Sequence, residues 1–151
     1  MEKNIHRFNL TLPTILWEDL EENSRRAGTN TTSTMIQYLR LRMAVDQFRM
    51  DQRERRQPAE ILVGNNAIAL DILPSRYRQQ SPKYHFGLGL PTADFDRARA
   101  IAEIQGLKFT AYALRAFAFG IEAEKEARVQ DIPYSRLGLP IQLGTNHFLF
   151  I

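Results

Sequence analysis

Two stretches of the chain alternate apolar and polar residues in the same way. In HRFNLTLP, residues 6–13, every second residue from Phe8 is apolar, and YHFGLGLP, residues 84–91, repeats the same apolar letters. A period of two places apolar side chains on one face of a strand and polar side chains on the other. The prolines that end the two stretches, Pro13 and Pro91, are 78 positions apart. We therefore expect two short strands, each with one buried face.

A pair of helices is expected after each strand. Thr14 is a candidate cap for a first helix that ends at Gly28, with a stripe formed by Trp17, Leu20, Ser24 and Ala27. The polar run TNTTST, residues 29–34, then caps a second helix with Ile36, Leu39 and Met43 on one stripe. Seventy-eight positions later the matching places hold Thr92, Phe95, Gly106, Thr110, Leu114, Phe117 and Ile121. This agreement indicates an internal duplication.

A lone strand of this length needs a partner for its backbone donors and acceptors. We expect the two strands to pair antiparallel within one chain, above four helices that bury their stripes beneath them. Pairing between two chains is the alternative, so the protein is a monomer or a homodimer. The fold class is mainly α with short β, divided into a first unit at 1–50, a connector at 51–83, a second unit at 84–126 and an extension at 127–151.

The sequence outside the repeat contains further apolar segments. RMDQRERRQP, residues 49–58, should continue the second helix to Pro58. Residues 59–73 form two apolar runs around Gly64, Asn65 and Asn66, which predicts a hairpin. The apolar residues 137–151 are also β-like, and we expect them to join the hairpin in a small sheet. Docking of HFLFI, residues 147–151, on a protein partner is the alternative.

Arginine is unevenly placed along the chain, with a cluster in its first half. The net charge is only +3, but residues 1–56 contain Arg25, Arg26, Arg40, Arg42, Arg49, Arg53, Arg55 and Arg56. This distribution suits a polyanionic partner, and a solvated surface of mixed charge is the alternative. The absence of cysteine excludes disulfides and thiol chemistry. No signal peptide or membrane-spanning run is present, so we expect a cytoplasmic protein.

Other residue types with chemical potential have simpler interpretations. Trp17, Phe95, Phe117 and Phe119 lie on or beside helical stripes and are expected in the core. Of the three histidines, His6 and His85 would approach each other only in a paired ribbon, and we expect neither a metal site nor a cofactor. Because no pair or triad of catalytic residue types has meaningful spacing, we do not expect an enzyme.

The strand RFNLTLP, the Gly28 turn, the polar cap at 29–34 and the second-helix stripe together resemble the ribbon-helix-helix family of DNA-binding proteins, the class of the Arc and MetJ repressors. Residues 84–126 resemble it a second time. Tandem, single-chain versions are similar to TraY-type accessory proteins of conjugative plasmids and T-DNA transfer. The resemblance covers residues 6–48 and 84–126 and implies a two-stranded ribbon that enters the major groove of double-stranded DNA.

The resemblance implies that the outward side chains of the first strand, Arg7, Asn9 and Thr11, contact bases. Arg suits guanine, Asn suits adenine, and Thr suits a thymine methyl or a hydrogen bond. An ordinary exposed polar face is the alternative. The matching positions of the second strand are His85, Gly87 and Gly89, and only His85 has a side chain for such contacts. The glycines either let the backbone approach an asymmetric site closely or indicate a copy that keeps the fold without reading bases, which we slightly favour.

Phosphate contacts are expected where the second helix of each unit begins, because the first amides of a helix attract anions. These amides belong to Asn30, Thr31 and Thr32 in the first copy and to Lys108, Phe109 and Thr110 in the second. Plain helix capping is the alternative explanation for these residues. Among them, Lys108 is the residue that capping explains least well.

The leading hypothesis is thus a sequence-specific DNA-binding protein, acting as a transcriptional repressor or as an accessory factor of a mobile element. The rival is a protein-assembly module that keeps the fold and binds a protein partner through its C-terminal segment or its glycine-faced second ribbon strand.

Overall fold

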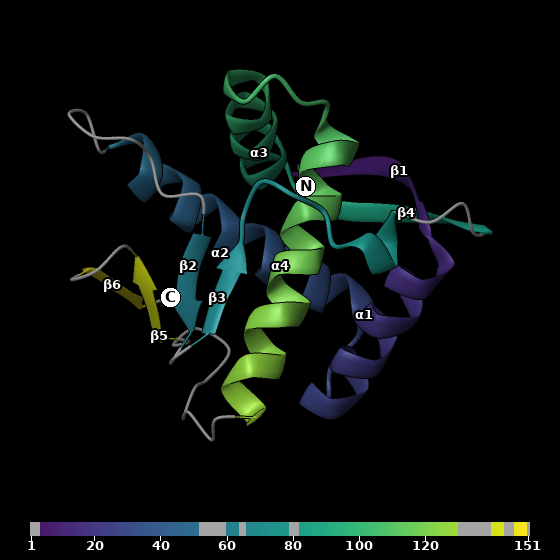
Figure 1. The fold of residues 1–151 in the computed structure, drawn as a ribbon. Helices are drawn as coiled ribbons and strands as arrows, with labels where there is room; N and C mark the ends of the chain where they lie inside the picture. Colours follow the sequence, from purple (N-terminus) through teal and green to yellow (C-terminus); the bar gives the residue numbers. More distant parts are fainter. Residues whose placement is uncertain are drawn as a thin grey trace.

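A computed structural model describes residues 4–51, 60–63, 66–78, 82–129, 140–143 and 147–150. Two similar units dominate it (Figure 1). The first contains β1 (Ile5–Pro13), α1 (Thr14–Ala27) and α2 (Thr31–Met50), and the second contains β4 (Lys83–Pro91), α3 (Thr92–Ile104) and α4 (Phe109–Val129). The prediction of a mainly helical protein with a two-stranded antiparallel sheet is confirmed.

The strands β1 and β4 form this two-stranded ribbon, side by side in Figure 1. Ile5 lies opposite Pro91 and Pro13 lies opposite Lys83, so the strands pair along their whole length. At one end the amide of Thr14 donates to Pro82 O (3.0 Å), and at the other the amide of Thr92 donates to Asn4 O (2.7 Å). The two bonds join residues that correspond at a spacing of 78, so the repeat in the sequence is also a repeat in hydrogen bonding.

The first helix of each unit ends at a glycine, as the sequence predicts. Gly28 and Gly106 have φ values of 70° and 74°, the left-handed region that suits glycine. The residue after each glycine bonds back into its helix, with Thr29 N donating to Ser24 O and Leu107 N to Ala102 O. The predicted start of α1 is wrong in detail, because Pro13 is the cap residue. Thr14 is the first helical residue, and its hydroxyl donates to Pro82 O (2.8 Å).

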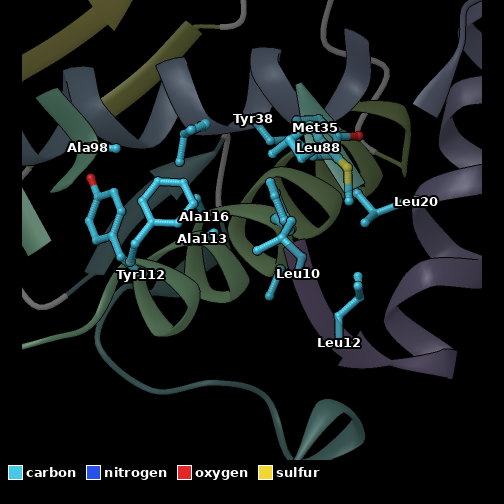
Figure 2. Close-up of a cluster of buried hydrophobic side chains, with 14 of the residues drawn as sticks. Leu10, Leu12, Leu20, Met35, Tyr38, Leu88, Ala98, Tyr112, Ala113 and Ala116 are labelled. Atoms are coloured by element: carbon cyan, nitrogen blue, oxygen red, sulfur yellow. The ribbon is translucent and has the colours of Figure 1, made fainter. Parts of the chain in front are cut away.

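Apolar side chains from the ribbon and all four helices form one large core (Figure 2). Among the predicted apolar strand residues, Leu10 and Leu12 in β1 and Leu88 and Leu90 in β4 are completely buried. Phe8 and Phe86 are partly buried and pack against the same core. The predicted aromatic residues also belong to buried clusters: Trp17, Phe95, Phe117 and Phe119. Ala27 is a wrong prediction: it is exposed, and Leu16 completes the buried stripe of α1 instead.

The helices α2 and α4 approach each other at Gly120, beside the ring of Tyr38. A Cβ atom at Gly120 would lie 2.2 Å from Tyr38 Cγ, far inside contact distance. The Tyr38 hydroxyl is fixed from the other side, because Asn23 Nδ2 donates to it at 2.9 Å. The absence of a side chain at Gly120 therefore sets how closely the two long helices pack.

Aromatic stacks close the two ends of the ribbon. His6 stacks on Phe95 with ring centroids 3.7 Å apart, and Tyr84 stacks on Trp17 at 4.2 Å. These pairs correspond to each other at the 78-residue spacing. The expectation that His6 approaches His85 is wrong, because the antiparallel register places His6 opposite Leu90 and His85 opposite Thr11.

A second, four-stranded antiparallel sheet lies on the other side of α4 from the ribbon (Figure 1). Its strands are β2 (Glu60–Val63), β3 (Asn66–Ala69), β5 (Pro140–Leu143) and β6 (His147–Phe150), in the order β3-β2-β5-β6. The expected hairpin is present, with Val63 opposite Asn66, and it pairs with the C-terminal hairpin. The expected continuation of the second helix to Pro58 is wrong, because α2 ends at Met50 and Asp51 is its cap residue. Residues 52–59, the turn residues Gly64 and Asn65, residues 137–139 and residue 151 lie outside the described residues.

A short 3-10 helix, η1 (Ser75–Tyr77), ties the connector to the first unit. The Tyr77 ring is buried in the large core, and its hydroxyl donates to Asp19 Oδ2 at 2.6 Å. Burial of this hydroxyl raises the Tyr77 pKa. Arg76 pairs with the same carboxylate at 2.9 Å. No helix in the described part of the chain is long and apolar enough to cross a membrane.

Buried charged groups join α2, α4 and the connector. Asp46 accepts hydrogen bonds from Arg42 Nε (3.0 Å), Arg49 Nη1 (2.9 Å) and the Tyr112 hydroxyl (2.6 Å). Arg42 Nη2 donates to Leu70 O at 2.7 Å, and Arg49 Nη2 pairs with Asp71 at 3.0 Å. Arg42 and Asp46 are fully buried. The interpretation of Arg42 and Arg49 as part of a basic surface is therefore wrong, because both guanidinium groups hold the fold together.

Replacing Gly120 with Ala should lower the free energy of unfolding by about 1–3 kcal/mol, because the new methyl group overlaps the Tyr38 ring. Urea denaturation followed by circular dichroism measures this loss. Gly87→Ala is the matched control: its Cβ would lie 3.7 Å from the nearest atom, and stability should change by less than about 0.5 kcal/mol. Equal stability of the two variants would contradict the close packing at Gly120.

Replacing Asp46 with Ala should cost about 3–5 kcal/mol, because two buried guanidinium groups lose their shared carboxylate. Asp71→Ala is the comparison. The Asp71 side chain is 48% exposed, so its loss should cost only about 1 kcal/mol. The same denaturation experiment tests both variants, and similar losses would show that Asp46 is not the centre of the network.

Candidate nucleic-acid interface

The outward face of the β1–β4 ribbon is polar and exposed. Arg7, Asn9 and Thr11 of β1 are all exposed, whereas Leu10 and Leu12 between and beside them are buried. This is the alternation that the sequence predicts. The residues opposite them in β4 are Gly89, Gly87 and His85 respectively. All of the predicted base-contacting residues therefore lie together on one face.

The register of the ribbon is symmetric about the residue pair Asn9–Gly87. Each residue of β1 pairs with a residue of β4, and the pair Asn9–Gly87 joins two positions that correspond in the repeat. The pairs on either side of it are also related by the repeat. Arg7 lies opposite Gly89 and Thr11 lies opposite His85, and the 78-residue spacing relates Arg7 to His85 and Thr11 to Gly89. The backbone of the ribbon thus has an approximate two-fold axis through Asn9 and Gly87.

The side chains on the outward face do not share this symmetry. A Cβ atom at Gly89 would lie 3.4 Å from Arg7 Nη1, and one at Gly87 would lie 3.7 Å from Asn9 Oδ1. The Arg7 and Asn9 side chains therefore reach across the ribbon, to the places where β4 has no side chains of its own. At the other end Thr11 Oγ1 and His85 Nδ1 are hydrogen-bonded at 3.0 Å.

The ribbon carries positive charge and no acidic residue. Neither β1 nor β4 contains Asp or Glu, and Arg7 forms no ion pair within the residues that the structure describes. Lys83 is exposed at the end of β4, with the same strand parity as His85. The sequence interpretation missed Lys83, although its spacing of two from His85 was a usable signal. The outward face is thus cationic at both of its ends.

The exposed arginines on the described helices of the first unit form ion pairs. Arg25 and Arg26 pair with Glu22, and Arg40 pairs with Asp94 at 2.6 Å. The hydrogen bond to Asp94 raises the Arg40 pKa. Arg53, Arg55 and Arg56 lie outside the described residues. Among the described arginines of residues 1–56, Arg7 alone forms no ion pair, and the attraction of this half to a polyanion stays a prediction.

The start of α2 is capped by its own sequence. The Ser33 amide donates to Asn30 Oδ1 at 2.8 Å, and the Thr34 amide donates to Asn30 O at 3.2 Å. The Asn30 side chain is therefore used in capping, as the simpler interpretation holds. The amides of Thr31 and Thr32 precede the first bonded turn and are the groups that an anion would meet.

The start of α4 presents a different set of groups. Lys108 is exposed at the position that corresponds to Asn30, and its carbonyl accepts from the Tyr112 amide at 3.0 Å. The Phe109 ring is buried against Phe8 with centroids 4.8 Å apart, so Phe109 offers an anion only its amide. Thr110 is half-buried. The contact between Phe109 and Phe8 places the start of α4 directly beneath β1.

Among the residues that the structure describes, no three His, Asp or Glu side chains gather in a way that could hold a metal ion. The outward face of the ribbon is suited to hydrogen bonding and charge neutralisation.

Comparison with known proteins adds no further constraint on this interface. No protein-family model, no curated protein and no solved structure matches the chain.

Proposed function

We propose that this protein binds double-stranded DNA in a sequence-specific manner, with the β1–β4 ribbon in the major groove. The observation that carries the proposal is the outward face itself, which presents Arg7, Asn9 and Thr11 on one exposed ribbon without any acidic residue. The major groove is about 12 Å wide and accommodates a two-stranded ribbon. Arg, Asn and Thr are side chains that distinguish bases there by hydrogen bonding or by methyl contact.

The arrangement around the ribbon supports a tandem ribbon-helix-helix fold. Hydrogen bonds at the ribbon ends, aromatic stacks and glycine-terminated helices all recur at the 78-residue spacing. Such a chain would supply alone what two identical subunits supply in a dimer. Under this proposal the protein is a cytoplasmic binding protein and not an enzyme, acting as a transcriptional repressor or as an accessory factor in conjugation.

Phosphate contacts would come from the helix starts beside the ribbon. The amides of Thr31 and Thr32 in α2 and of Phe109 and Thr110 in α4 carry the positive end of a helix dipole. Lys108 adds a full charge at the second start only. These groups would hold the DNA backbone and fix the register of the ribbon without reading sequence.

Binding of a protein partner is the second candidate function, and one observation favours it. A groove of about 320 Å³ lies between β3 and α4, lined by Ile68, Leu70, Phe119 and neighbouring residues, with the 64% exposed Ile72 at its rim. Ile68, Leu70 and Phe119 are themselves buried, so the exposed large apolar side chain at this groove is Ile72. An apolar groove with an exposed apolar residue is typical of protein contacts. The C-terminal strand β6 pairs with β5, and its side chains lie outside the described residues.

Replacing Arg7, Asn9 and Thr11 together with Ala should abolish sequence preference and leave the fold intact, because all three side chains are exposed. Each lost base contact is worth about 1–3 kcal/mol of discrimination, so the ratio of specific to non-specific affinity should fall at least tenfold. Fluorescence anisotropy with a selected site and a scrambled site measures this ratio. Arg25→Ala is the control for loss of one cation, because Arg25 lies in the last turn of α1, at the end of the helix away from β1.

Retained preference in the triple variant would overturn the assignment of these readers. Absence of salt-sensitive DNA binding in the unaltered protein would overturn the DNA-binding proposal and favour the protein-partner candidate.

Replacing Lys108 with Ala should weaken binding to all DNA sequences alike and reduce the slope of log K against log salt by about one. The physical reason is the loss of one cation that releases a counterion from a phosphate. Lys125→Ala is the matched control, because Lys125 is an exposed lysine within α4, far from the start of that helix. An unchanged slope for Lys108→Ala would remove Lys108 from the phosphate contacts.

A further inference from the structure

The scaffold of the ribbon is symmetric, and its outward face is not. The repeat relates Arg7 to His85, Asn9 to Gly87 and Thr11 to Gly89, so every corresponding pair on this face differs in chemistry. The backbone register, in contrast, is centred on Asn9 and Gly87. The two halves of the face therefore have the same geometry and different recognition groups.

Side chains of β1 lie over the positions where the β4 glycines have no side chain. Arg7 Nη1 lies 3.4 Å from the position of a Cβ at Gly89, and Asn9 Oδ1 lies 3.7 Å from that at Gly87. Gly89 corresponds to Thr11 and Gly87 to Asn9, so a symmetric ribbon would have side chains at both places. The guanidinium group is consequently directed over the half of the ribbon that β4 leaves empty.

The two ends of the face present distinct hydrogen-bonding groups. One end has the Arg7 guanidinium, which only donates and suits guanine. The other end has the hydrogen-bonded pair of Thr11 and His85, with Lys83 beyond it. A symmetric dimer presents the same groups to both half-sites, and its operators mirror that symmetry as palindromes. A face with two different ends does not favour a palindrome.

From this geometry we infer that the protein recognises a non-palindromic DNA site and binds it in a single orientation. The inference rests on the proposed function and specifies its substrate. One half-site supplies a guanine to Arg7, the central base pair supplies an adenine to Asn9, and the other half-site faces Thr11 and His85. The starts of α2 and α4 would contact DNA phosphates equally well in both orientations of the protein on the site. The side chains of the ribbon alone therefore decide the orientation.

Selection of bound sequences from a random duplex pool tests the inference. The unaltered protein should enrich a motif that is not an inverted repeat. The variant His85→Arg/Gly87→Asn/Gly89→Thr restores the side chains of β1 on β4 and should enrich an inverted repeat instead. The atoms nearest to a Cβ at Gly89 would be Arg7 Nη1 and Ile5 Cγ2, both at 3.4 Å. Both belong to exposed side chains, which can shift by a few tenths of an ångström. Circular dichroism establishes that the variant is folded.

Directed cleavage measures orientation without relying on that variant. The chain contains no cysteine, so a single cysteine carrying an iron chelate can be placed at Ile5 or at Lys83. These exposed residues correspond in the repeat and lie at opposite ends of the ribbon. On the selected site, Ile5→Cys should cut one side and Lys83→Cys the other, each with at least a fivefold preference.

The possible results distinguish a failure of the single-orientation inference from a failure of the proposed DNA-binding function. An inverted-repeat motif for the unaltered protein, or equal cleavage on both sides by each probe, overturns the single orientation and leaves DNA binding in place. No enriched motif at two salt concentrations overturns the proposed function itself.

Discussion

The strands β1 and β4 have only each other as pairing partners within the described chain, so the ribbon determines how the two halves of the molecule are joined. Unpaired backbone groups on a buried face would cost far more than a protein of this size can offset. Once the strands pair, their apolar residues form one surface, and four helices are needed to cover it. The large core around Leu10 and Leu88 is the result.

The two units differ where α2 meets the connector. Gly120 of α4 corresponds to Arg42 of α2 in the repeat. Gly120 lets α4 pack closely against Tyr38. The Arg42 guanidinium group donates hydrogen bonds to Leu70 O and Asp46. A strictly repeated sequence would have either two such guanidinium groups or none. The single network therefore gives the connector and the four-stranded sheet a defined place on one side of an otherwise symmetric bundle.

Local patterns in the sequence predicted the features that local physics decides. Alternation located both strands, and the left-handed glycines Gly28 and Gly106 ended two helices. The hairpin turn and the small second sheet were also expected. Features that depend on tertiary partners were not predictable in the same way. Arg42 and Asp46, one helical turn apart, looked like a surface ion pair because the groups that bury this pair, among them Leu70 and Tyr112, lie far along the chain. The reach of Arg7 across Gly89 depends on the strand register, which no single segment of the sequence specifies.

A ribbon made within one chain has a consequence for how the molecule behaves on dilution. Two separate subunits sharing a ribbon come apart when their concentration falls below the dissociation constant, and their stability depends on concentration. Here the connector keeps β1 and β4 in the same molecule, so each strand experiences the other at an effective concentration on the order of millimolar. A few copies in a cell would then remain as fully assembled as a concentrated solution.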